Sequence, residues 1–305
     1  MPEITDYYFL ENNYSEEQVL IRNATRDWVK KHVKPNIEKH FQKAETPSYL
    51  IKELASIGAF GLIIPEKYGG VGADYISFGL MMQELERGDS SIRVISSIQT
   101  SLVMYAIYRF GSEKQKVKYL NKLATGEILG AFGLTEPDFG SNPSSMHSYF
   151  KEEGDNIVIN GSKMWIGNAE TADIAIVWIK DQKGNVRGVI VETNKVTNFT
   201  TTTLKDKWSF RSSKTGELVF SGSIVPKEQV LAKSESIQNA YECLNIGRYA
   251  VAWGSIGIAM ECYETALQYS KERKAFGTEI YNHQSIAFKL ADMYVDIENA
   301  RNLVY

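Results

Sequence analysis

The sequence predicts an α+β fold with an N-terminal helical domain, a middle antiparallel β-barrel or sandwich domain, and a C-terminal helical bundle. Apolar residues recur at helical spacing through the first third of the 305 residues. Short β-rich segments with turn signals between them fill the middle, and helical spacing returns after about residue 236. The predicted domains are therefore residues 1–126, 127–235 and 236–305.

Helices of the first domain are marked by capping and breaking residues. Ser15-Glu-Glu-Gln18 and Ser112-Glu-Lys-Gln115 both match a capping box, and Asp74 is a suitable N-cap for a further helix. Pro35 and Gly58 end two of the runs. The apolar faces of the four helices comprise Ile21, Ala24 and Trp28, then Leu50, Leu54 and Ile57, then Phe78, Met81, Met82 and Leu85, and finally Tyr119, Leu120 and Leu123.

Strands of the middle domain are predicted where β-branched and aromatic residues cluster. The runs lie at residues 157–159, 174–179, 189–191, 199–204 and 218–220. Turn pairs such as Asn160-Gly161 and Gly184-Asn185 lie between them. This spacing of short strands favours an antiparallel barrel or sandwich.

Helices of the last domain contain three internal glycines, Gly247, Gly254 and Gly257, which would let another backbone pack closely. A final helix is expected to open around His283, with Ile286, Leu290, Met293, Ile297 and Ala300 on its apolar face. It reaches Tyr305 without a stop signal. We therefore expect the natural chain to continue, so that the C-terminal bundle is incomplete in this sequence.

Composition excludes several classes of function. Apolar residues make up 43% of the chain, and 34 basic against 37 acidic residues give a net charge of −3, which argues against general nucleic-acid binding. Cys243 and Cys262 are interpreted as buried small apolar residues in a reducing compartment, and the four scattered histidines predict no metal site. Without a targeting leader or an apolar run of membrane length, we expect a cytoplasmic bacterial protein with no membrane insertion.

Polar and small residues with a chemical character gather at residues 132–141, Phe-Gly-Leu-Thr-Glu-Pro-Asp-Phe-Gly-Ser. Hydroxyl and turn residues leaving a strand expose backbone amides and side-chain donors together, which suits a planar, acceptor-rich ring or the amide arm of a ligand. By composition alone this stretch is only a polar loop. Lys163-Met-Trp-Ile-Gly-Asn168 follows, and its tryptophan is either core or part of a site.

Motifs of other enzyme classes are absent from the sequence. There is no G-x-G-x-x-G after a strand, no G-x-x-x-x-G-K-[ST] and no G-x-S-x-G. The glycine cluster Gly69-Gly-Val-Gly72 is sufficiently explained as a loop leading to a helix cap. The sequence therefore gives no support to a nicotinamide, ATP-dependent or serine hydrolase function.

Several motifs, taken together and in order, resemble the acyl-CoA dehydrogenase family. They are Leu134-Thr-Glu-Pro137, Gly140-Ser141, Trp165-Ile166, Glu272-Arg-Lys-Ala-Phe-Gly277 and Gln284. The resemblance covers nearly the whole chain, and it is nearest to the glutaryl-CoA branch. It implies FAD as cofactor, an acyl-CoA thioester as substrate, electron-transfer flavoprotein as electron acceptor and a homotetrameric assembly.

Site residues follow from the resemblance by position. The flavin would contact Phe132, Leu134, Thr135, Trp165, Ile166 and Gly167, and Ser141 beside them would touch the pantetheine–phosphate part of CoA. Arg273, Phe276 and Gln284 would reach the FAD of a neighbouring subunit, where a guanidinium suits a pyrophosphate. Without the motif, Arg273 is interpreted as a solvated charge at a helix end.

Substrate contacts are implied by two further matches to the glutaryl-CoA branch. Leu244, Asn245 and Arg248 would follow the CoA arm, and an arginine among apolar helix residues needs an anionic partner if it is buried, although an internal ion pair would also serve. Arg93, helped by Ser97, would hold the distal carboxylate of the substrate. Glu86 lies seven residues before Arg93, so the two also read as a structural ion pair.

Two departures from the family pattern leave the chemistry open. Gly167 stands where a threonine is common, which keeps an acyl-CoA oxidase as an alternative. Dehydrogenation needs a base, and Gly247 occupies the helical position that carries it in some members. We therefore expect the catalytic glutamate beyond Tyr305, the alternative being a catalytically silent flavin or CoA-binding module.

Overall fold

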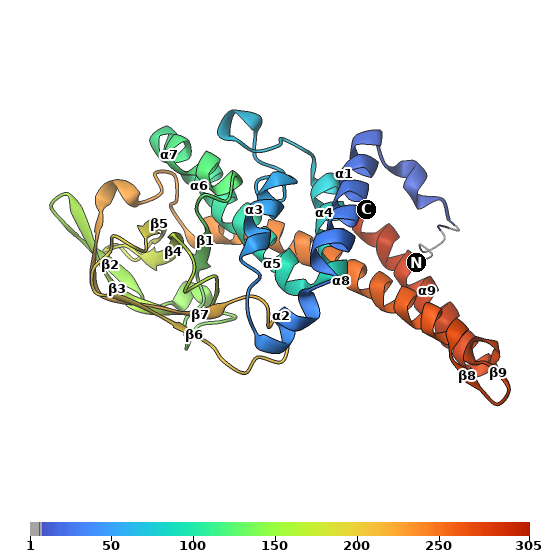
Figure 1. Ribbon diagram of the computed structural model, residues 1–305. Coiled ribbons are helices and arrows are strands. Elements are labelled where there is room, and N and C mark those ends of the chain that lie inside the picture. Colours follow the sequence, from blue (N-terminus) through green and yellow to red (C-terminus); the bar gives the residue numbers. More distant parts are fainter. Residues whose placement is uncertain (1–5, 7) are drawn as a thin grey trace. The chain divides into compact units, whose positions relative to one another are not determined.

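The computed structural model describes Asp6 and residues 8–305, so most of the N-terminal segment used in the leader argument, residues 1–5 and 7, lies outside the described part. The chain forms two compact units. The first comprises Met1–Pro35, Tyr75–Arg93 and Tyr249–Tyr305, and the second comprises Asn36–Asp74 and Val94–Arg248. Figure 1 gives the element labels used below.

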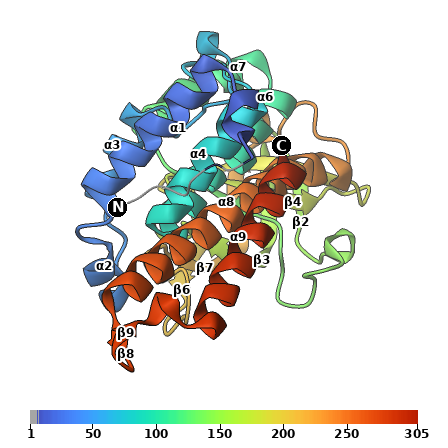
Figure 2. The same ribbon diagram turned by 90° about the vertical axis from the view of Figure 1, so that its right-hand side faces the viewer.

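The first unit is helical. It contains α1 (Glu16–Trp28), α4 (Tyr75–Gly88), α9 (Gln284–Val304), the later part of α8 (Ile237–Glu272) and a small hairpin of β8 (Lys274–Ala275) and β9 (Thr278–Glu279). The capping box predicted at Ser15 is confirmed, because Ser15 and Gln18 exchange side-chain to backbone hydrogen bonds. Helices α8 and α9 run side by side toward the hairpin (Figures 1 and 2), with Ile256, Met260 and Ile297 buried between them.

Glycines of α8 allow the close packing that the sequence predicted. A Cβ atom added at Gly257 would lie 2.0 Å from the carbonyl oxygen of Gln83 on α4, and one at Gly254 would lie 2.8 Å from Oε2 of Glu86. Gly247 differs, because its Cβ would meet only Leu102 Cδ2, at an ordinary 3.4 Å. The prediction of close backbone packing is therefore confirmed for Gly257, whereas at Gly254 the close neighbours are the side chains of Glu86 and Arg93, and at Gly247 the prediction is wrong.

A buried charge network links the helices of the first unit. The guanidinium of Arg26 on α1 binds the fully buried carboxylate of Glu84 on α4 through two hydrogen bonds of 3.0 and 3.1 Å. Arg87 pairs with Glu264 and lies 3.3 Å from Glu261 on α8. Ion pairs of this kind are costly to break because the remaining charge stays buried.

The second unit combines short helices with the sheet. Its helices are α2 (Ile37–Lys43), α3 (Tyr49–Ser56), α6 (Tyr105–Phe110), α7 (Glu113–Ala124), the end of α5 (Ser90–Ser97) and the start of α8. The capping box at Ser112 is confirmed as the start of α7. The strands are β1 (Gly130–Gly133), β2 (Tyr149–Glu153), β3 (Asn156–Gly167), β4 (Ile174–Lys180), β5 (Val186–Glu192), β6 (Phe199–Thr203) and β7 (Thr215–Pro226).

These seven strands form one sheet in the order β1-β4-β2-β3-β7-β6, with β5 also paired to β4. The helical, β-sheet and helical sequence of elements confirms the predicted fold class. The purely antiparallel arrangement is wrong in two places, because β2 pairs with β4 in parallel at Tyr149↔Lys180, and β1 pairs with β4 in parallel from Gly130↔Ile174 to Gly133↔Val177. Such a pairing needs a long connection, which residues 134–173 supply through β2 and β3.

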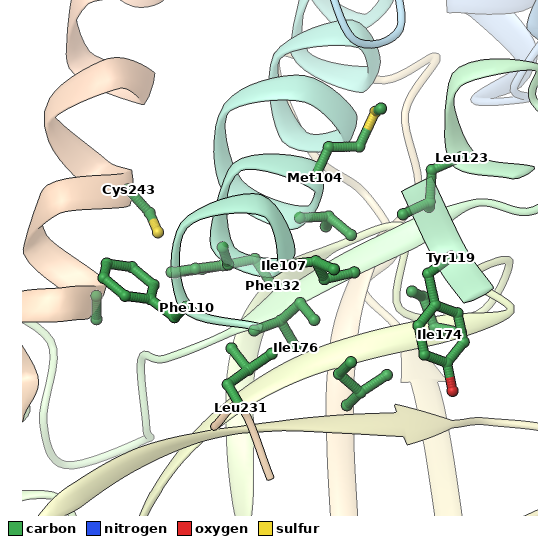
Figure 3. Close-up of a cluster of buried hydrophobic side chains, with 14 of the residues drawn as sticks. Met104, Ile107, Phe110, Tyr119, Leu123, Phe132, Ile174, Ile176, Leu231 and Cys243 are labelled. Carbon is green, nitrogen blue, oxygen red and sulfur yellow. The ribbon is translucent and has the colours of Figure 1, made fainter. Parts of the chain in front are cut away.

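Helices pack on the sheet around one apolar core of the second unit. Figure 3 shows Ile107 and Phe110 of α6 close to Ile176 of β4, with Cys243 of α8 at the side. Phe110 also meets the ring of the fully buried Trp178 edge-on at 6.3 Å. Cys243 is buried as predicted, whereas Cys262 on α8 is exposed, so that part of the prediction is wrong.

Between α5 and α6 the chain forms a π-helical segment, Ile98–Met104. Its buried Gln99 donates from Nε2 to the carbonyl oxygens of Leu123 and Ile128, and its Oε1 accepts from the amide of Gly130 at 2.9 Å. Gln99 thus fixes the point at which β1 begins. In the described part of the chain, no helix is both long and apolar enough to cross a membrane.

Candidate functional site

A cavity of about 540 Å³ lies in the second unit, where β1, β3 and the start of α8 meet. We call it the Thr135 pocket. It is lined by Phe132, Leu134, Thr135, Gly140, Ser141, Pro143, Trp165, Ile166, Gln238, Tyr241, Leu244, Asn245 and Arg248. Nine of the predicted site residues are therefore brought together, although they come from three separate stretches of sequence.

A bulge in strand β3 turns Trp165 into this pocket. The register with β7 shifts between Lys163↔Leu218 and Ile166↔Gly216, and Trp165 within the bulge has a φ of 59°. Bulges redirect side chains and are common beside functional sites, and a positive φ is unusual for a bulky residue. Trp165 is 65% exposed, so it is not a core residue.

The opposite wall is the chain leaving β1. Phe132 and Leu134 are buried, and Thr135 follows them at the pocket. The amide of Met164 donates to the carbonyl oxygen of Thr135 at 2.8 Å, which ties this wall to the β3 bulge. No hydrogen bond to another described residue involves the Thr135 hydroxyl, so it is available to a ligand.

A buried ion pair between Lys163 and Glu136 contacts this wall. The ammonium of Lys163, which is fully buried, donates to Glu136 Oε1 at 2.8 Å and to the Leu134 carbonyl at 3.1 Å. Burial lowers the pKa of Lys163 to about 8, against the opposing attraction of Glu136. Burial also raises the pKa of Glu136, but Lys163 and the amides of His147 and Ser148 outweigh it and lower that pKa on balance.

One face of α8 forms the remaining wall. Tyr241, Leu244, Asn245 and Arg248 are spaced three or four residues apart, as neighbours on one helical face are. Arg248 Nη1 donates to Asn245 Oδ1 at 2.8 Å. The expectation that burial would force an anionic partner on Arg248 is wrong, because its side chain is exposed.

A second cavity of about 420 Å³ shares Trp165 with the first. We call it the Trp208 pocket, lined by Val94, Ile98, Trp165, Gly167, Lys207, Trp208, Ser209, Phe210, Ser213 and Thr215. A Cβ at Gly167 would lie 2.3 Å from Cδ1 of Ile98, so the isoleucine occupies the space that a side chain at position 167 would need. Gly167 therefore lines this second cavity rather than the first.

Five predicted site residues lie outside both linings. Arg93 belongs to the first unit, where its buried guanidinium pairs with Glu86. Ser97 is buried, with its hydroxyl oxygen 3.4 Å from that of Ser101. Arg273 directly precedes β8, Phe276 lies between β8 and β9 and is 98% exposed, and Gln284 is the first residue of α9. Their binding roles stay predictions.

Sequence reasoning missed Gln238, Tyr241, Gly140 and Pro143 of the Thr135 pocket and most of the Trp208 pocket. Helical spacing back from Leu244 and Asn245 could have found Tyr241. The segment 205–215 gave no such pattern, because Trp208 and Phe210 stand among lysine, arginine and serine residues.

The chemistry of the Thr135 pocket is that of a binding cavity with donors. It offers the hydroxyl groups of Thr135, Ser141 and Tyr241, the amide of Asn245 and the guanidinium of Arg248, beside the indole of Trp165. None of its lining residues, all within the described part of the chain, is an aspartate or a glutamate. Such a site suits a planar, acceptor-rich and anionic ligand.

Family comparisons match the chain along nearly its whole length. The N-terminal, middle and C-terminal domains of acyl-CoA dehydrogenase match residues 15–127, 131–223 and 237–305. The chain belongs to the acyl-CoA dehydrogenase family. The resemblance inferred from the sequence motifs is thereby confirmed.

Relatives within the acyl-CoA dehydrogenase family include proteins named after different acyl-CoA substrates. An acyl-CoA dehydrogenase of Bacillus subtilis is 38% identical over 95% of this chain and 78% of its own length. A short-chain specific acyl-CoA dehydrogenase of Clostridium acetobutylicum is 36% identical over 97% of this chain and 79% of its own length. A glutaryl-CoA dehydrogenase of Mycobacterium smegmatis, solved in complex with FADH2, has a TM-score of 0.95 at 37% identity, over 97% of this chain and 76% of that chain.

Proposed function

We propose that this protein binds FAD and oxidises the Cα–Cβ bond of a short-chain acyl-CoA thioester, with glutaryl-CoA as the substrate. The observation that carries the proposal is the Thr135 pocket, in which a free hydroxyl, an exposed tryptophan and a helix with Arg248 and Asn245 face one cavity. Family membership narrows the ligand class to a flavin and a CoA thioester.

The residues present fit FAD. Thr135 offers a hydroxyl with no partner among the described residues, and Trp165 offers the edge or face of an exposed indole. The Ser141 hydroxyl is a donor suited to phosphate oxygens, and the guanidinium of Arg248 remains for the CoA arm. The apolar side chains of Phe132, Leu134 and Ile166 provide the remaining surface that a tricyclic ring requires.

Residues of the pocket bind and orient rather than transfer protons. FAD, when bound, supplies the hydride-accepting chemistry of the reaction. Thr135 and Trp165 would fix the ring, and Asn245 and Arg248 would fix the CoA arm, so that the thioester is held in one orientation. Because no carboxylate lines the pocket, the acceptor of the α-proton must come from outside these thirteen residues.

The choice of glutaryl-CoA rests on Arg93. Its guanidinium is 4% exposed and pairs with the buried carboxylate of Glu86. A single oriented guanidinium recognises a carboxylate through paired hydrogen bonds and penalises an uncharged acyl chain. In the proposed reaction, Arg93 exchanges Glu86 for the distal carboxylate of the substrate, which would then leave as CO2 to give crotonyl-CoA.

A binding experiment tests this proposal. The FAD-loaded protein is titrated with glutaryl-CoA and with butyryl-CoA, and glutaryl-CoA should bind more tightly. Arg93→Lys keeps the charge beside Glu86 but loses the forked geometry, so its affinity for glutaryl-CoA should fall at least tenfold, with butyryl-CoA unaffected. Arg93→Ala should give the same loss of preference, but it also leaves Glu86 unpaired.

The control for this titration is Arg109→Ala. Arg109 is exposed and pairs with Glu242 outside both cavities, so its loss should change neither affinity. Equal binding of both thioesters by the unaltered protein, or glutaryl-CoA binding unchanged in both Arg93 variants, would reject the substrate assignment. Failure of the protein to bind FAD or any CoA ester would reject the function itself.

A second candidate function is a flavin or CoA-binding module without catalysis. The observation that favours it is the pocket lining, which lacks a carboxylate. Dye reduction with butyryl-CoA or glutaryl-CoA distinguishes the two, because only a dehydrogenase reduces the dye. Rapid peroxide formation with O2 as sole acceptor would instead identify an oxidase, the alternative raised by Gly167.

We also propose electron-transfer flavoprotein as the acceptor and a homotetramer as the working assembly. The β8–β9 hairpin supports the assembly, because it exposes Phe276 almost completely, next to Arg273. Aromatic side chains are enriched at interfaces between protein chains, so Phe276 is the contact to test. Light scattering should show a mass of four chains, and Phe276→Ser should lower it.

A further inference from the structure

Lys163 has no side-chain contact with the interior of the Thr135 pocket, yet its contacts reach the pocket walls. Its ammonium donates to the carbonyl oxygen of Leu134, a lining residue, at 3.1 Å and to Oε1 of Glu136 at 2.8 Å. Two residues later, the same strand presents Trp165 to the cavity. Lys163 therefore joins the wall that leaves β1 to the wall formed by the β3 bulge.

Glu136 extends this connection to the loop 136–148. Its Oε2 accepts from the amide of His147 at 2.6 Å and its Oε1 from the amide of Ser148 at 3.0 Å. The carboxylate thus closes the loop at its far end, and the loop carries the lining residues Gly140, Ser141 and Pro143. A single ammonium–carboxylate contact therefore governs both the wall and the loop.

The glycine at position 133 leaves space for the side chain of Lys163. A Cβ at Gly133 would lie 3.3 Å from Cγ of Lys163, so a glycine there leaves room for the lysine stem under β1. The ammonium is fully buried, and its remaining neighbour is the sulfur of Met146 at 3.7 Å. Charged groups that act on it are Glu136 from the loop and Lys180 from β4, and His147 faces Glu136 through its backbone amide.

We propose that Lys163 is a positioning residue of the Thr135 pocket, whose protonated ammonium holds the Leu134 carbonyl and the Glu136 carboxylate so that the ligand-binding walls keep their shape. The proposal rests on the proposed function for the identity of the ligand, FAD, but its geometry does not depend on it. Loss of the proton weakens both contacts, because a neutral amine is a poorer donor than an ammonium.

The test uses two variants of the full chain. Lys163→Met keeps the buried stem but leaves Glu136 as an unpaired carboxylate, whereas Lys163→Met with Glu136→Gln removes both charges. Thermal unfolding of the double variant should return close to that of the unaltered protein, while its affinity for FAD stays at least tenfold weaker. Full recovery of FAD affinity together with stability would show a merely structural role and overturn the proposal.

A pH profile gives an independent readout. FAD affinity of the unaltered protein should fall between pH 7 and 9.5 with a midpoint near 8, and the double variant should show no such step. Lys151→Met, at an exposed lysine of β2, is the matched control and should retain the step. A step of equal size in the double variant would overturn the proposal.

Hydrogen exchange separates this proposal from the proposed function. After correction for intrinsic exchange, amides of residues 136–148 should lose protection above pH 8 in the ligand-free protein, and in Lys163→Met they should lack it at every pH. If FAD does not bind but the exchange result holds, only the function fails. Unchanged protection in Lys163→Met would overturn the positioning role even in a protein that binds FAD.

Discussion

Lys163 and Trp165 are two residues apart on β3, but their side chains differ sharply in solvent exposure. Lys163 is sealed from solvent with its charge paired, whereas Trp165 is 65% exposed with a positive φ. The bulge between them explains the contrast, because it ends the regular alternation of inward and outward side chains. Substituting Lys163 should therefore change the pH dependence of stability, whereas substituting Trp165 should change mainly ligand affinity.

Stability should depend on pH through Lys163. Its folded pKa of about 8 lies below the ordinary lysine value, so between about pH 8 and 10.5 the unfolded chain binds more protons than the folded one. The free energy of unfolding contributed by this group should therefore rise with pH across that window. Urea unfolding of the unaltered protein and of the Lys163→Met, Glu136→Gln double variant measures the difference. A difference that stays constant from pH 7 to 10 would contradict it.

Removal of the Trp165 side chain should affect binding far more than stability. Trp165→Gly suits the φ of 59° and removes a mostly exposed side chain, so the free energy of unfolding should change by no more than about 1 kcal/mol. FAD affinity should fall at least tenfold. Trp178→Ala, at a fully buried position, should instead cost about 3–5 kcal/mol. Chemical denaturation and FAD titration check both, and a large stability loss in Trp165→Gly would contradict the first.

Among the elements, α8 carries glycines with opposite roles. Gly257 faces the Gln83 carbonyl at a distance that no Cβ tolerates, while Gly247 faces ordinary contacts. The sequence pattern could not separate them, because helical spacing shows which residues share a face but not how near the facing backbone lies. Telling the two glycines apart requires the position of α4, and α4 belongs to a distant part of the sequence.

These glycines predict a matched pair of variants. Gly247→Ala should stabilise the protein by about 0.5–1 kcal/mol, because alanine loses less conformational freedom in a helix. Gly257→Ala should destabilise it by about 1–3 kcal/mol or more, since the added methyl forces α4 and α8 apart. Thermal unfolding compares the two. Equal effects of the same sign would show that α4 does not approach α8 as described.

Local signals predicted the elements well where the cause is local. The boxes at Ser15 and Ser112 start helices, because the capping contacts span only three residues. Strand β2, Tyr149–Glu153, was not predicted, since it carries three charged residues in five and owes its place to pairing with β3. The parallel pairing of β1 with β4 was also missed, because register between distant strands leaves no trace in either strand alone.

The same distinction holds within the site. Phe132, Leu134, Thr135, Ser141 and Trp165 were identified through family motifs, and the structure places them around one cavity. The Lys163–Glu136 pair was not foreseen, because 27 residues separate its members and nothing in the sequence shows that both are buried. For Arg248 the reverse error occurred, since apolar neighbours along a helix do not prove that its own side chain is covered.

At the scale of the molecule, each unit has its own means of stabilisation. The first unit has a charge network centred on Glu84, and the second has a continuous apolar core between its helices and its sheet (Figure 3) together with the buried Lys163–Glu136 pair. The stabilisation from apolar contacts varies little with pH. The stabilisation from a buried carboxylate changes when the carboxylate is protonated. Acid should therefore act on the first unit through Glu84.

Glu84→Gln should reveal this dependence. Burial raises the pKa of Glu84, but the Arg26 hydrogen bonds and charges lower it on balance, so its stabilisation is present above the ordinary carboxyl pKa and is lost as pH falls through the lower folded value. At pH 7 the variant should lose about 3–5 kcal/mol by leaving Arg26 without its charged partner. The loss should shrink on acidification, as measured by urea unfolding at several pH values. A loss that grows in acid would contradict the sign.

The π-helical turn at Ile98–Met104 makes this region sensitive to chain length. A π-helical turn already accommodates one residue more than an α-helical turn, so inserting a further residue there would turn α6 by about 100° relative to the end of α5. Ile107 and Phe110 would then face away from the strands they now cover, and Gln99 would release the first strand of the sheet. A length change of a single codon at this point should therefore be less tolerated than any single substitution within it.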